Sequence, residues 1–202
     1  MKINIPGKHI FRKAVVSGNA QVRDGARVTD KAVVAGEARV TGRAVIEGNA
    51  RVSSFARVRG DAVVSGKAFV EGRAFVDGDA VVRENAVVGG NADVGGDAVI
   101  EGKAEVTDDA EVTDDARVSG NAVIKGNAVV AGFARVGGNT FVVGDARIGG
   151  WAVVTGAVFV GGDAVIKGKA RIGGDAVILG GIWDGSEGEI TSGRWMAPGI
   201  PA

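Results

Sequence analysis

A six-residue period dominates this sequence. Written in sixes from Ala14, the chain reads AVVSGN, AQVRDG, ARVTDK, AVVAGE and continues without an insertion to AVILGG, which ends at Gly181. Each of the 28 hexapeptides has Val or Ile at its third position, and all but those that begin at Thr140 and Val158 start with Ala. Glycine occupies the fifth position in 22 of them. So regular a pattern indicates a solenoid, in which one short unit is stacked many times.

The period excludes an α-helix and favours short strands. Six is not a multiple of the helical repeat, and a glycine in every unit costs a helix about 1 kcal/mol relative to alanine. A strand of the form Ala-x-Val places Ala and Val on one side and the middle residue on the other. The Gly and the Asn or Asp that usually follow tolerate the positive φ of a tight turn. Three such units close a triangle in 18 residues, and stacked triangles form a parallel β-helix with coils about 4.8 Å apart.

The repeat resembles that of the hexapeptide-repeat proteins, which have an aliphatic residue, two or three turn residues and then a small residue. The segment VSGNAV at residues 118 to 123 fits this pattern. The resemblance implies an all-β fold, a single-stranded left-handed parallel β-helix shaped as a triangular prism, with about nine 18-residue coils and a length of about 44 Å. We expect an N-terminal cap or leader at residues 1 to 13, the β-helix at 14 to 181, and a C-terminal tail or cap at 182 to 202 that folds back through Trp183 and Trp195.

Familiar hexapeptide-repeat proteins are acyltransferases, and the resemblance implies a histidine base and a loop that interrupts the coils to cover the substrate. This chain has one histidine, His9, which precedes the repeat, and no hexapeptide is interrupted. A second branch of the family, the γ-type carbonic anhydrases, holds zinc with three histidines, and this chain also lacks cysteine. We therefore interpret the protein as no enzyme, with no catalytic residue and no cofactor. A degenerate acyltransferase is the alternative.

Charge and hydropathy add little about partners. The 24 basic residues balance the 24 acidic ones, so no net field attracts nucleic acid or an anionic membrane. The sequence has no apolar run long enough for a signal segment or a membrane span. We expect a cytoplasmic protein without nucleic-acid, membrane or small-molecule partners, while a place as a virion component stays open.

One corner column is acidic. Because a coil has 18 residues, Asp61, Asp79, Asp97 and Asp115 stack one above another. Their carboxylates repel, and a bound cation such as Ca²⁺ would offset the repulsion. Solvated turn residues explain the column more simply, since Asp favours turns and exposed charges are screened. We name no metal site and keep the four as weak candidates.

The next two coils of that column carry aromatic residues, Phe133 and Trp151. The spacing predicts a stacked pair at the surface. Such a pair is a candidate platform for a polysaccharide or another surface component, and a binding module of this kind is a further alternative function.

The outward residue between Ala and Val distinguishes the three faces of the prism. We call one of them the apolar face, because eight of its ten outward residues are apolar, against three of nine and five of nine on the others. Its apolar members are Val15, Val33, Phe69, Val87, Val123, Phe141, Phe159 and Val177, and its charged members are Arg51 and Glu105.

Propensity for β-structure favours branched and aromatic residues on all three faces alike, so it does not explain the apolar face. A long apolar stripe is uncommon on a monomer and marks a partner surface. We expect a homo-oligomer joined through this face, with a trimer favoured by the resemblance and a dimer as the alternative. The chain's own tail is a competing cover for the last coils.

Overall fold

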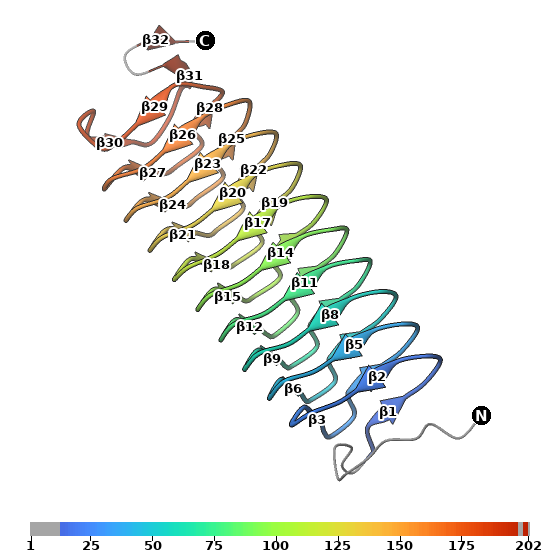
Figure 1. Ribbon diagram of the computed structural model, residues 1–202. Coiled ribbons are helices and arrows are strands. Elements are labelled where there is room, and N and C mark those ends of the chain that lie inside the picture. Colours follow the sequence, from blue (N-terminus) through green and yellow to red (C-terminus); the bar gives the residue numbers. More distant parts are fainter. Residues whose placement is uncertain (1–12, 198–199, 202) are drawn as a thin grey trace.

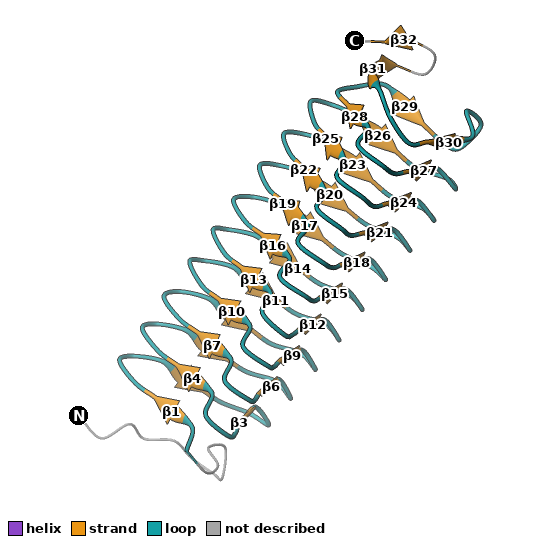
Figure 2. Cartoon of the chain, turned by 180° about the vertical axis from the view of Figure 1, so that it is seen from behind, coloured by secondary structure: helices purple, strands orange, loops and turns teal. Residues whose placement is uncertain are grey.

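The computed structural model describes residues 13–197 and 200–201, and all regular structure in these residues is β-strand (Figure 1). The chain winds around a straight axis with three short strands per coil, and strands at the same place in successive coils form three sheets (Figures 1 and 2). Apart from one antiparallel hairpin at the C-terminal end, all pairs are parallel. The predicted three-sided parallel β-helix of the hexapeptide-repeat type is confirmed.

The sheets collect every third strand. The first sheet contains β1 (Val15–Val16), β4 (Val33–Val34), β7 (Arg51–Val52), β10 (Phe69–Val70), β13 (Val87–Val88), β16 (Glu105–Val106), β19 (Val123–Ile124), β22 (Phe141–Val142), β25 (Phe159–Val160), β28 (Val177–Ile178), β31 (Arg194–Ala197) and β32 (Ile200–Pro201). The second contains β2 (Gln21–Val22), β5 (Arg39–Val40), β8 (Arg57–Val58), β11 (Phe75–Val76), β14 (Asp93–Val94), β17 (Glu111–Val112), β20 (Val129–Val130), β23 (Arg147–Ile148), β26 (Val165–Ile166) and β29 (Ile182–Trp183). The third contains β3 (Arg27–Val28), β6 (Val45–Ile46), β9 (Val63–Val64), β12 (Val81–Val82), β15 (Val99–Ile100), β18 (Arg117–Val118), β21 (Arg135–Val136), β24 (Val153–Val154), β27 (Arg171–Ile172) and β30 (Glu189–Ile190).

The interior is an apolar column made from the first and third residues of each hexapeptide. The inward Ala and Val or Ile side chains are buried from Ala20 to Ile178, most of them completely. Each coil is also bonded to the next by its backbone, as where the Val15 N–H donates to the Ala32 carbonyl at 2.9 Å and the Asn19 N–H to the Gly36 carbonyl at 2.7 Å. Packing and hydrogen bonding therefore repeat together along the rod.

The fifth residue of nearly every hexapeptide has a positive φ, which explains the glycine there. Six hexapeptides carry another residue at this position, and all six have φ between 58° and 64°: Asp24, Asp30, Ser54, Glu84, Asp108 and Asp114. Five of these are acidic, and in each case the carboxylate accepts a hydrogen bond from the N–H of the glycine one coil further on. The acidic side chains thus bridge neighbouring turns where glycine is absent.

The two exceptions to the inward alanine lie one above the other. Thr140 and Val158 are 18 residues apart and both are completely buried. The Thr140 hydroxyl donates to the Gly137 carbonyl at 2.7 Å, so its polarity is satisfied. The turn before Val158 is distorted, because Gly156 has φ 112° whereas other glycines at this position cluster near 70°. A local change of the turn accompanies the larger side chain.

The C-terminal residues continue the β-helix, which corrects the expected fold-back of the tail. Strands β29, β30 and β31 pair in parallel with β26, β27 and β28, so residues 182–197 form a tenth coil. Val165 pairs with Ile182 and Val177 with Arg194, one residue less than a full coil. Strand β32 then turns back antiparallel on β31. The sequence pattern missed this coil because its spacing shifts by one residue and tryptophan replaces valine.

Candidate functional site

The apolar face is a continuous column along the first sheet. Strand pairing places Val15 beside Val33, Phe69 beside Val87, Val123 beside Phe141, and Phe159 beside Val177, each in register. The structure therefore brings together all eight apolar residues that the sequence assigns to this face. Arg51 lies between Val33 and Phe69, and Glu105 between Val87 and Val123.

No described segment covers this column. Val15 is 48% exposed, Phe69 38% and Phe141 45%. Strand β31 extends the first sheet at its end instead of lying across β22, β25 and β28, so the tail is not the cover within the part of the chain that the structure describes. Half or more of several large apolar side chains is removed from water only if another molecule packs there.

The other two faces carry more charge on the same geometry. On the second sheet Arg39 lies beside Arg57, and on the third Arg117 lies beside Arg135. Burial raises the pKa of Asp93 on the second sheet, and the Asp77 and Glu111 carboxylates raise it further, while Arg59 lowers it. The difference between the faces supports the apolar face as the candidate site.

The aspartate column does not form a set of metal ligands. Among residues 13–197 and 200–201, no group of three or more His, Cys, Asp or Glu side chains is placed to hold a metal ion. The first aspartate, Asp61, accepts a hydrogen bond from the Arg43 guanidinium one coil earlier, at 2.5 Å. Asp79, Asp97 and Asp115 follow it in the same corner, where the backbone hydrogen bonds of the turn are made to neighbouring coils.

The predicted aromatic pair is confirmed. The ring centroids of Phe133 and Trp151 are 4.2 Å apart and the rings are inclined by 10°. Both remain well exposed, Trp151 at 60%. Each ring covers one face of its neighbour, which leaves the outer faces and the edges for contact with a ligand. Binding of a polysaccharide there stays a prediction.

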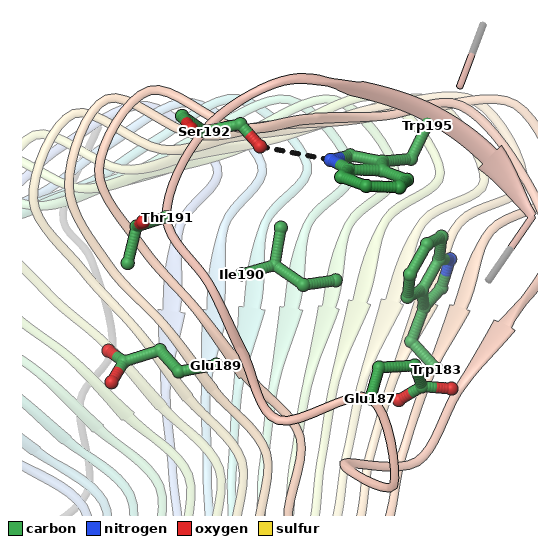
Figure 3. Close-up of a pocket in the computed structure, with 7 residues that line it drawn as sticks. All are labelled: Trp183, Glu187, Glu189, Ile190, Thr191, Ser192 and Trp195. Carbon is green, nitrogen blue, oxygen red and sulfur yellow. Dashed lines mark hydrogen bonds between the residues drawn. The ribbon is translucent and has the colours of Figure 1, made fainter. Parts of the chain in front are cut away.

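A closed end distinguishes the C-terminal coil. Trp183, Ile190 and Trp195 point inward from its three strands (Figure 3). Trp183 is completely buried and donates from Nε1 to the Gly180 carbonyl at 2.8 Å, while Trp195 Nε1 donates to the Ser192 carbonyl at 2.9 Å. The indole rings meet edge to face, with centroids 6.1 Å apart. A hollow of about 350 Å³ lies over them, lined also by Glu187, Glu189, Thr191 and Ser192 (Figure 3).

Sequence reasoning missed a second hollow, of about 390 Å³, on the surface of the rod. Its lining residues are Phe55, Arg57, Arg73 and Phe75. The 18-residue spacing is the signal that finds it, because Phe55 and Arg73 share one column and Arg57 and Phe75 another. The Arg59 guanidinium carbon lies 4.4 Å from the centroid of the Phe75 ring, so a cation already occupies one side of that ring.

The remaining predictions concern catalysis and location. His9 lies outside the described residues. The described segments contain no helix that is long and apolar enough to cross a bilayer. A comparison with protein-family models finds no match, and a comparison with curated proteins finds no significant one. The fold and the three sheet faces therefore carry the argument about function: this is a ten-coil parallel β-helix of the hexapeptide-repeat type with one uncovered apolar face.

Proposed function

We propose that the protein is a non-enzymatic structural rod that associates with copies of itself through the apolar face and presents its other two faces as a rigid scaffold. The observation that carries this proposal is the register of eight apolar side chains in one column of the first sheet. Burial of such a column against a second copy is favourable by about 25 cal/mol for each Å² of apolar surface removed from water.

Rigidity follows from the repeated core. Inward side chains such as Val64, Ile100 and Val130 are completely buried, and each coil is hydrogen-bonded to the next. In such a stack each coil depends on its neighbours, so the rod behaves as a cooperative unit over its length. A scaffold role requires this property, because positions on the outer faces must keep fixed separations.

The non-enzymatic part of the proposal rests on two features. The only histidine in the sequence, His9, precedes the first coil, and strands β1 to β28 follow one another without an inserted loop. An acyl-coenzyme A consumption assay on the native chain and on His9→Ala tests the acyltransferase alternative. Turnover that is lost in the variant would contradict the proposal.

The experiment that tests self-association is a measurement of solution mass by light scattering. The native chain is expected to be larger than its 20.3 kDa monomer, and the double variant Phe141→Glu with Phe159→Glu is expected to be monomeric. The matched control places glutamate at outward valines on the other two faces, Val153→Glu with Val165→Glu, and is expected to keep the native mass. Circular dichroism verifies the fold of both variants. A monomeric native chain would overturn the proposal.

A further inference from the structure

Two charges break the apolar face, and they have opposite signs. Arg51 lies in the third coil and Glu105 in the sixth, and both are exposed. Within the described part of the chain neither forms an ion pair, although the Arg51 guanidinium carbon lies 5.7 Å from the centroid of the Phe69 ring. An interface on this face must bury both charges, which is strongly unfavourable unless each meets a partner of opposite sign.

The relative direction of two rods decides whether the charges are matched. In a parallel, in-register pair, each coil faces the same coil of the other copy, so Arg51 meets Arg51 and Glu105 meets Glu105. In an antiparallel pair the order of coils is reversed across a two-fold axis perpendicular to the rod. An axis between the fourth and fifth coils places Arg51 of each copy opposite Glu105 of the other, and symmetry forms this pair twice.

The same register matches the apolar residues. It places Phe69 opposite Val87 of the other copy, Val33 opposite Val123, and Val15 opposite Phe141. Because the coils stack along a straight axis, a column on one rod follows the facing column over the whole overlap (Figures 1 and 2). Phe159 and Val177 lie beyond the eight paired coils.

A corner column beside the face provides an independent check. It carries the sixth residue before each strand of the first sheet, and over the first eight coils these exposed residues are only Lys and Asn: Lys13, Lys31, Asn49, Lys67, Asn85, Lys103, Asn121 and Asn139. In the antiparallel register every Lys lies opposite an Asn: Lys13 opposite Asn139, Lys31 opposite Asn121, Asn49 opposite Lys103, and Lys67 opposite Asn85.

Sliding one copy by one coil destroys this pattern. A shift in one direction places Lys67 opposite Lys103, and a shift in the other places Lys31 opposite Lys103. Like charges that face each other across an interface are unfavourable. The register that pairs Arg51 with Glu105 is therefore also one in which no lysine faces another lysine.

From these positions we propose that the rod forms an antiparallel homodimer through the apolar face, with its two-fold axis between the fourth and fifth coils. This inference rests on the proposed self-association and specifies its symmetry and register. It departs from the trimer that the resemblance to hexapeptide-repeat proteins implies, because a cyclic trimer of parallel rods gives Arg51 and Glu105 no partner of opposite sign on this face.

Charge exchange tests the register. Arg51→Glu and Glu105→Arg are each expected to weaken the dimer about tenfold or more, because each creates two like-charged pairs. The double variant with both changes is expected to restore a native dissociation constant. Arg39→Glu on the second face is the matched control and is expected to leave the constant unchanged. Single variants with native affinity, or a double variant that is not restored, would overturn the antiparallel register even if self-association persists.

Spin-label distances provide a second test that does not depend on affinity. The chain has no cysteine, so Ser17→Cys, Ser53→Cys and Thr107→Cys each give one label in the corner column that follows the face. In the antiparallel dimer the two labels are displaced along the rod by seven coils, about 34 Å, for Ser17, and by three coils, about 14 Å, for Ser53 and Thr107. Equal distances at all three sites would show parallel rods and overturn the proposal. A monomeric native chain would instead remove the self-association on which it rests.

Discussion

The carboxylate of Asp114 accepts a hydrogen bond from the Gly132 N–H, 2.9 Å away and one coil further along the rod. Asp114 has φ 58°, a conformation that disfavours residues with a side chain. Glu84 and Gly102 repeat the relationship at 2.9 Å. An acidic residue at the glycine position therefore offsets its backbone cost by bonding to the neighbouring turn.

Asp114→Ala is expected to lower the free energy of unfolding by about 1–2 kcal/mol, because the unfavourable φ stays and the acceptor is lost. Asp114→Gly removes both, so its effect is smaller. Urea denaturation measures the difference. Asp115→Ala, at the next residue, is the control and is expected to change stability by less than about 0.5 kcal/mol. An equal loss in both alanine variants would contradict the assignment.

Two adjacent glycines are expected to respond differently to alanine. Gly150 has φ 65°, and a Cβ added there would lie 2.8 Å from Gly168 N and 2.9 Å from Gly168 O. Gly149 lacks a positive φ, and the nearest atom to an added Cβ is the Ala131 carbonyl oxygen at 3.9 Å. Gly150→Ala is expected to cost about 1–3 kcal/mol, whereas Gly149→Ala is neutral within about 0.5 kcal/mol. Thermal unfolding compares them, and equal melting temperatures would refute the steric account.

Trp183→Ala is expected to destabilise the chain by about 3–5 kcal/mol, because it opens a large cavity at the closed end of the rod. Ile182→Ala is the control, since Ile182 belongs to the same strand and is 54% exposed. Hydrogen exchange is expected to accelerate first in β26 to β31, the strands nearest the cavity. Uniform acceleration along all ten coils would instead indicate that the cap stabilises the rod only as a whole.

The raised pKa of Asp93 predicts a dependence of stability on pH. The folded chain binds the proton more tightly than the unfolded chain, so stability falls as pH rises above the ordinary pKa of 3.8 toward the raised value. Asp93→Asn removes this penalty and is expected to raise the melting temperature at neutral pH, with a gain that shrinks in acid. Asp97→Asn controls for the loss of one negative charge. A gain that is independent of pH would contradict the prediction.

The fold was predictable because the hexapeptide pattern determines both strand and turn. Ala and Val or Ile at fixed positions identify the buried side of each strand, and the 18-residue lap gives the registry that places Phe141 beside Phe159 and Phe133 beside Trp151. The tenth coil was not predictable from that pattern, because Gly181 takes the place of the usual alanine and Trp183 that of the usual valine.

Side-chain bonds to the backbone were also outside the reach of the pattern. The sequence shows Asp114 as a turn residue but not the direction of its carboxylate, which depends on the position of the Gly132 N–H in the next coil. The apolar face, in contrast, required only the parity of the strand and the length of the lap. Its occupant is a property of two molecules, so one chain's periodicity indicates a partner surface without determining its symmetry.

The constant lap from β1 to β28 makes the protein a graduated ruler. Deleting or duplicating 18 residues shortens or lengthens it by one graduation of about 4.8 Å, while every later side chain keeps its wall of the prism. A change of six residues instead rotates all that follows by one wall and splits the greasy stripe between two sides. Reach and adhesion can thus be altered separately in this architecture, by choosing whole laps or thirds of a lap.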